Sequence, residues 1–226
     1  MKYIALFIFA ACLSMPCFSS PANAAGEKGI NQPLAALFES RVIVFGHRPK
    51  RYSRQWHFIR QADRVEKQMP DQQRDEVWLK GKDGSLNSYQ AIYDKPRLVI
   101  TYNRSDLKSI SNYPRWDLVA TVLPADLRKR LKYQGAAEVM GHPASRYRGH
   151  LHGADVELTW IDDLMLPALY REIGQRRDTQ VEIKQLYTLK KAPWKPIVTA
   201  GYRFMDFADV GDNESDPALQ KLAHRP

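Results

Sequence analysis

The passage from Tyr147 to Ile173 constrains the fold most strongly, because apolar and polar residues alternate along it. Val156, Leu158 and Trp160 occupy every second position after a Gly-containing turn. A period of two with bulky apolar groups on one side is typical of a β-strand with one buried face. A second alternating run begins at Leu166. The passage therefore predicts three antiparallel strands joined by a turn and a corner.

Similar alternation recurs along the rest of the chain and predicts a mainly β (α+β) fold. We expect about nine to eleven strands in a strongly curved antiparallel meander or half-open barrel, with two or three short helices. The helical spacing of apolar residues predicts an early helix at residues 32–44, and polarity changes predict others at residues 123–131 and after Asp216. Residues 104–116 are interpreted as a long loop or flap. Residues 198–207 are expected to form the last strand.

The N-terminus has the features of a secretory signal peptide. Lys2 precedes an apolar run, and residues 21–24 end in a small-x-small pattern, which predicts cleavage after Ala24. Residues 25–226 are then a single β-rich domain with a short acidic and helical C-terminal tail. Both cysteines, Cys12 and Cys17, precede the cleavage point. We therefore expect an exported, periplasmic protein without disulfides.

The chain is basic, with a formal net charge of +9. Its lysines and arginines are spread along the sequence rather than gathered into one block. In an exported protein such residues favour a solvated surface, or attraction to an anionic membrane surface or an acidic envelope protein. Nucleic acid is not an expected partner.

The sequence contains no catalytic motif, which lowers the expectation of an enzyme without excluding it. It lacks G-x-S-x-G, H-E-x-x-H, a phosphate-binding glycine loop and C-x-x-C. His150 and His152 could project from one strand as two metal ligands, but no third ligand of suitable spacing follows. We interpret both, with His142, as surface residues. No cofactor is predicted.

An acidic segment from Asp206 to Asp216 contrasts with the otherwise basic chain. Oxygen-rich loops of this kind can hold calcium, and the candidate ligands are Asp209, Asp212, Glu214 and Asp216. Their spacing is not that of an EF-hand. The alternative is structural, with Asp216 capping a helix and other acids pairing with lysine or arginine.

Large apolar and aromatic residues of the predicted strands are the candidates for a binding site. They would either fill a core or line a concave apolar cavity, and one residue set can do both. The cavity candidates are Trp56, Phe58, Trp78, Tyr102, Val156, Leu158, Trp160 and Leu169.

Three short segments together resemble the periplasmic lipoprotein-carrier (LolA/LolB/RseB-like) superfamily. They are residues 141–147, residues 156–162 with Trp160 and Asp162, and the pair Leu166-Pro167. The resemblance covers residues 54–207 and implies an open β-barrel whose mouth is plugged by helices, with an apolar cavity that receives lipid acyl chains. Residues 104–116 and the acidic tail depart from this pattern and favour a relative with its own ligand.

The leading functional prediction is a non-enzymatic periplasmic binding or carrier protein for a lipid or lipoprotein acyl chain, as in outer membrane lipoprotein sorting. One alternative is an envelope interaction or sensory module that uses a sheet edge or residues 104–116. Another is a calcium-dependent domain or enzyme that uses the segment Asp206–Asp216.

Overall fold

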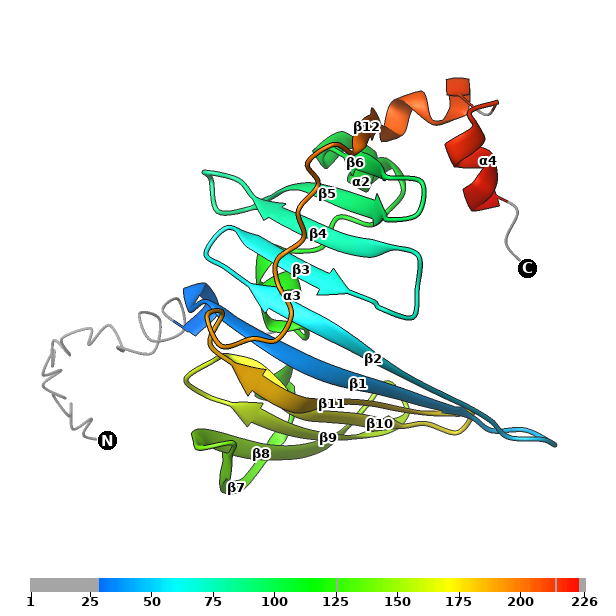
Figure 1. The fold of residues 1–226 in the computed structure, drawn as a ribbon. Coiled ribbons are helices and arrows are strands. Elements are labelled where there is room, and N and C mark those ends of the chain that lie inside the picture. Colours follow the sequence, from blue (N-terminus) through cyan, green and yellow to red (C-terminus); the bar gives the residue numbers. More distant parts are fainter. Residues whose placement is uncertain (1–28, 125, 214, 224–226) are drawn as a thin grey trace, which may run out of the picture.

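The computed structural model describes residues 29–124, 126–213 and 215–223. The predicted signal peptide at residues 1–24 lies outside this part of the chain. A twelve-stranded, open, strongly curved sheet dominates the fold (Figure 1). The strands are β1 (Leu34–Val44), β2 (Lys50–Arg60), β3 (Arg64–Gln68), β4 (Asp75–Lys80), β5 (Leu86–Tyr93), β6 (Leu98–Tyr102), β7 (Lys132–Val139), β8 (His142–Leu151), β9 (Ala154–Ile161), β10 (Leu166–Ile173), β11 (Arg177–Tyr187) and β12 (Arg203–Asp206).

The strand order is β12-β6-β5-β4-β3-β2-β1-β11-β10-β9-β8-β7. Two meanders, β2 to β6 and β7 to β11, therefore meet on opposite sides of β1. All pairs are antiparallel except β12 with β6, which is parallel. The predicted fold class is confirmed, and the opening passage forms β8, β9 and β10 as expected.

The predicted helix at residues 32–44 is wrong, because this segment forms β1. Leu34, Leu37 and Phe38 have helical spacing, but Leu34, Ala36 and Phe38 also alternate, and all three are buried. β1 pairs with β2 along one edge and with β11 along the other. Two full ladders of backbone hydrogen bonds outweigh a weak local preference for helix.

Short helices connect or follow the strands. They are the α-helices α2 (Arg104–Ser109), α3 (Trp116–Thr121) and α4 (Pro217–Ala223), and the 3₁₀ helices η1 (Leu127–Arg130), η2 (Phe207–Asp209) and η3 (Gly211–Asn213). The expected helix at residues 123–131 is thus reduced to one 3₁₀ turn, whereas the C-terminal helix is confirmed.

The segment 104–116, expected to be an irregular loop, contains α2. Asn103 is the reason, because its side chain accepts hydrogen bonds from the backbone N–H groups of Ser105 and Asp106. The Asp106 carboxylate in turn accepts from the Asn103 N–H at 2.8 Å. This capping box satisfies N–H groups that a helix start leaves free. Residues 198–207 likewise differ from the expected strand, because only β12 is extended.

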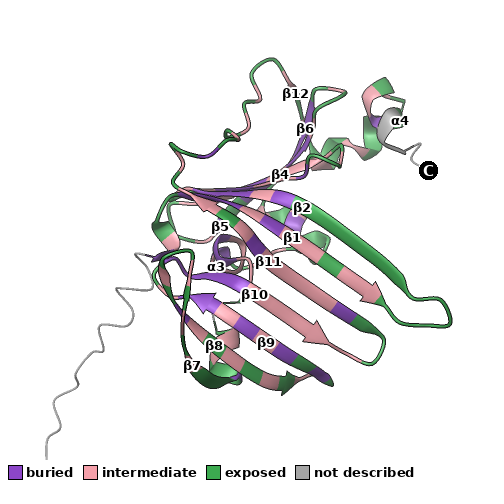
Figure 2. Cartoon of the chain, turned by 60° about the horizontal axis from the view of Figure 1, so that its bottom comes forward, coloured by how far each residue is buried: buried purple, intermediate pink, exposed green. Residues whose placement is uncertain are grey.

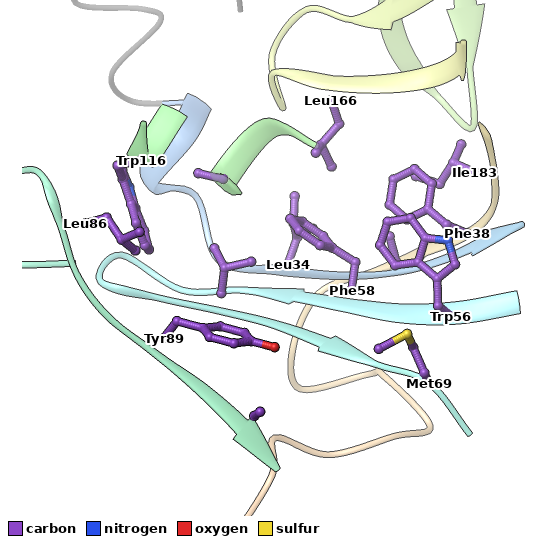
Figure 3. Packing of buried hydrophobic residues seen from close by; sticks show 14 of the residues in the cluster. Leu34, Phe38, Trp56, Phe58, Met69, Leu86, Tyr89, Trp116, Leu166 and Ile183 are labelled. Carbon is purple, nitrogen blue, oxygen red and sulfur yellow. The ribbon is translucent and has the colours of Figure 1, made fainter. Parts of the chain in front are cut away.

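The main core lies on the concave face of the sheet, where α2, α3 and α4 contribute Leu107, Trp116 and Leu219. Phe38 of β1 stacks on Trp56 of β2 with ring centroids 4.6 Å apart. Figure 3 shows these residues packed with others from both meanders. The core therefore joins the two meanders across β1.

Residues 188–202, which we call the strap, run from β11 to β12 across the convex face, drawn in orange in Figure 1. Its residues Ala192 and Ile197 pack against apolar residues of that face. Glu66 of β3, which is fully buried, accepts a hydrogen bond from the Ile197 N–H at 2.9 Å. Arg64 donates to the same carboxylate at 2.6 Å. The strap is thus fixed by a buried, charge-assisted hydrogen bond.

Arg60 of β2 is also fully buried and joins segments that are distant in the sequence. Its guanidinium donates to the carbonyl oxygens of Gln32 at 3.2 Å, Ala120 at 2.9 Å, Gly29 at 2.8 Å and Leu164 at 2.7 Å. Burial lowers the pKa of Arg60 to about 10, which leaves the side chain charged at neutral pH. The planar, multi-donor guanidinium suits such a junction.

Candidate ligand-binding groove

An apolar groove of about 360 Å³ lies on the concave face, between the sheet and the segment that ends in α3. β1, β2, β3, β4 and β11 form one wall, and residues 112–122 form the other. The groove is lined by Ser40, Trp56, Phe58, Val65, Lys67, Trp78, Asn112, Pro114, Leu118, Val119, Val122 and Val181. Its size and mostly apolar lining are those of small-molecule sites in proteins.

The sheet wall is held rigid by aromatic packing. Trp56 stacks on Phe38 and meets Phe58 edge to face, with ring centroids 6.3 Å apart. The Trp56 indole N–H donates to the Ser40 hydroxyl at 2.9 Å. Because this hydrogen bond satisfies the indole nitrogen, the Trp56 ring offers its apolar surface without an unpaired buried polar atom.

The opposite wall comes from α3 and from Val122, the residue that follows it. Val122 has a φ of 67°, a left-handed conformation that is strained for a β-branched residue. The Thr121 hydroxyl lies 2.6 Å from the carbonyl oxygens of both Asp117 and Leu123 and holds this turn. The strained turn ends α3 and places Val122 in the groove wall.

Lys67 is the cation in the groove lining. Its ammonium lies 4.9 Å from the ring centroid of Trp56, a distance at which a cation is attracted to an aromatic face. Lys67 lies on the same face of the sheet as Phe58, its register partner. The groove therefore combines an apolar floor with one positive charge.

The predicted cavity residues divide into three groups in the structure. Trp56, Phe58 and Trp78 line the groove. Tyr102 continues an aromatic row beyond it, because Trp78 contacts Tyr89 at 4.2 Å and Tyr89 contacts Tyr102 at 5.3 Å between centroids.

The remaining predicted residues lie elsewhere. Val156, Leu158 and Trp160 are buried in a separate cluster with Leu131 and Met165, so this side of β9 forms core. Leu169 is paired in register with Thr159, on the opposite face of the sheet from Leu158. Leu169 and Leu158 both border a polar hollow of about 440 Å³, together with Gln134, Arg146, Tyr147, Arg148, Glu157 and Thr159.

Sequence reasoning missed the α3 wall and Lys67. Leu118 and Val119 belong to a short helix, and Val122 directly follows it. Such a short helix has little amphipathic signal of its own, so its position depends on tertiary contacts. Lys67 was not among the predicted cavity residues, although β3 places it beside Trp56. Its position two residues after Val65, which puts both side chains on one face of a strand, was the available signal.

The acidic segment and the histidines form no metal site among the described residues, in which no three ligand-type side chains come together. Glu214 lies outside the described residues. Asp216 pairs with Arg203 at 2.5 Å and accepts from the Ala218 N–H at 2.8 Å. His142 pairs with Asp163, and His150 with Asp155.

We expect the Asp216 carboxyl to titrate well below its ordinary range. Arg203, and then the N–H groups of Ala218 and Leu219, lower its pKa from 3.8 to about 2. Because the folded pKa is depressed, the stabilisation of α4 by Asp216 is complete above pH ~4 and is lost as the pH falls toward 2. The Ala218 amide resonance, followed by NMR during acid titration, should have a midpoint near the lower value. A midpoint near 3.8 would show that Arg203 and the amides do not stabilise the Asp216 carboxylate. Asp216→Asn should remove the titration, while its side-chain oxygen still accepts from the Ala218 N–H.

No helix in the described residues is long and apolar enough to span a membrane. No family model matches the sequence and no curated protein matches it.

Several solved structures match the fold at low sequence identity. PNGF-II is 9% identical, with a TM-score of 0.42, over 84% of this chain and 33% of its own. The MucA/MucB complex of Pseudomonas aeruginosa is 13% identical, with a TM-score of 0.42, over 78% of this chain and 57% of the matched chain. A LolA superfamily protein from Nitrosomonas europaea is 6% identical, with a TM-score of 0.28, over 80% of this chain and 97% of its own.

This chain thus spans about a third of PNGF-II and just over half of the MucA/MucB chain. The structural neighbours include a member of the LolA-like superfamily that the sequence resembles. Each of these TM-scores is below 0.5.

Proposed function

We propose that this protein is an exported, non-enzymatic binding or carrier protein that holds an acyl chain of a lipid or lipoprotein in the groove between the sheet and α3. The observation that carries the proposal is the apolar groove itself, with Trp56, Phe58 and Val119 in its lining and Lys67 as its cation. An acyl chain would contact the aromatic and aliphatic walls, and its release from water would drive binding.

Lys67 favours a ligand with an acidic head group. Its ammonium is close enough to Trp56 to remain beside the apolar lining, and no described residue forms an ion pair with it. A carboxylate or phosphate at the end of the chain would complete a charge-assisted hydrogen bond there.

A residue that fills the groove should prevent binding. We expect Val119→Trp to weaken binding of a fluorescent long-chain fatty acid by more than roughly tenfold, because the larger side chain occupies the space of the ligand. Titration of the purified protein with the fatty acid measures this directly. Native mass spectrometry of the same preparation should show a co-purified lipid that is lost in the variant.

Val198→Trp is the matched control. Val198 lies on the strap with 75% of its surface exposed, so the same substitution there should leave fatty-acid binding unchanged. Lys67→Met keeps the apolar stem but removes the charge, and should weaken binding of the acid more than binding of its methyl ester. Wild-type protein that neither carries a lipid nor binds the fatty acid would overturn the proposal.

A further inference from the structure

The β1–β2 hairpin projects beyond the rest of the sheet as an arm (Figure 1). Its tip, residues 44–52, is exposed throughout and is drawn in green in Figure 2. The turn between β10 and β11 lies beside the tip, where the Phe45 N–H donates to the Arg176 carbonyl at 2.9 Å. Two hairpins therefore support one projecting end.

The tip carries positive charge and no acidic residue of its own. Residues 44–52 contain no aspartate or glutamate. The exposed cations at the tip and at the adjoining turn are Arg48, Lys50, Arg51, Arg176 and Arg177. No described residue forms an ion pair with them.

The acids nearest the tip in the register are already paired. Asp178 is bound by Arg171, and Glu172 accepts a hydrogen bond from the Tyr170 hydroxyl. Glu39, which lies farther from the tip, is bound by Arg41. The five cations therefore keep their charge available for an external partner.

Apolar side chains are exposed on the same tip. The exposed fractions are 39% for Val44, 42% for Phe45 and 57% for Tyr52. Tyrosine is enriched at the level of lipid head groups in membrane proteins, with its ring toward the apolar layer and its hydroxyl in water, and phenylalanine occurs on the apolar face of segments that lie in the membrane interface. Exposed aromatic groups among unpaired cations are a recurring combination at membrane-binding surfaces.

We propose that this tip docks the protein onto an anionic phospholipid surface. The cations would be attracted to the lipid phosphates, while Phe45 and Tyr52 would enter the head-group layer. A hairpin tip can reach a flat surface that the rest of the molecule does not touch. A stable protein complex commonly buries about 20–30 residues a side, more than the tip and its adjoining turn provide.

The membrane proposal does not depend on a ligand in the groove. Ligand binding is measured in solution without vesicles, and docking is measured with vesicles of fixed composition. Failure of one proposal therefore leaves the other result unchanged.

Vesicle flotation tests the docking. The wild-type chain should float with vesicles of equal parts phosphatidylcholine and phosphatidylglycerol, but not with phosphatidylcholine alone, and added salt should weaken the binding. The triple variant Arg48→Glu, Lys50→Glu, Arg51→Glu should lose roughly tenfold or more in affinity. Phe45→Ser with Tyr52→Ser should weaken binding while the salt dependence remains.

A variant of equal net charge is the control. Lys82, Lys95 and Lys190 are exposed cations away from the tip, and changing all three to glutamate should weaken binding much less. All variants keep the same N-terminal residues, so any contribution from these is common to them. Equal binding by the tip variant and the wild type would overturn the proposal. Equal losses in both triple variants would also overturn it, because net charge alone would then explain the binding.

Discussion

Arg60→Leu is expected to lower the free energy of unfolding by about 3–5 kcal/mol. The substitution removes the donor shared by four carbonyl groups, and each buried acceptor left without a partner costs about 1–3 kcal/mol. The energy recovered by no longer burying a charge offsets part of this loss. Urea denaturation followed by tryptophan fluorescence measures the difference.

Arg60→Lys and Arg51→Leu complete the experiment. Lysine keeps the charge but concentrates its donors on one atom, so it should restore only part of the stability. Arg51 lies on the same strand but is exposed, and its replacement should change stability by less than about 0.5 kcal/mol. A loss below about 1 kcal/mol in Arg60→Leu would show that the junction contributes little.

Glu66→Ala should release the strap and destabilise the fold by about 3 kcal/mol. The carboxylate is buried and accepts from Arg64, Gln68 and the Ile197 N–H, and removal of one partner of a buried ion pair costs about 3–5 kcal/mol. We expect the lower end of this energy range, because the Arg64 side chain is 26% exposed and water can solvate it after Glu66 is removed. Limited proteolysis should show faster tryptic cleavage after Lys190 and Lys191, which lie on the strap.

Two other variants distinguish the strap from a general loss of charge. Glu66→Gln keeps an oxygen acceptor for the Ile197 N–H and should be cleaved more slowly than Glu66→Ala. Glu157→Ala removes an acid that pairs with Arg148 at the surface and should leave cleavage at the strap unchanged. Unchanged cleavage in Glu66→Ala would show that the strap is held by its apolar contacts alone.

Local alternation was sufficient to predict the sheet where one face is buried and the other is solvated, as in β8 and β9. It failed for β1, whose Ala35 is buried on the convex face because it packs with Ala192 of the strap. A central strand with both faces covered loses its clear polar–apolar alternation. Nothing near residue 35 in the sequence indicates that residue 192 will cover it.

The binding groove could be predicted on its sheet side only. Trp56, Phe58 and Trp78 were identified because large aromatic residues on strands face either a core or a cavity. Val119 and Val122 could not be identified from the sequence, because they line the groove only where α3 packs over the sheet. The alternation of Val156 and Trp160 predicts that they share an inward face. It does not predict whether that face is covered and forms core, as it is here, or stays open as a cavity.

The place of β1 between the two meanders has a consequence for the order of folding. Its pairing with β2 is local, but its pairing with β11 joins Ala35 to Tyr187, and such long-range contacts form slowly. During synthesis the first meander can form while β1 still has one unpaired edge, which is a template for pairing with other chains. Any truncation that removes β11 should leave this central strand open and prone to aggregation.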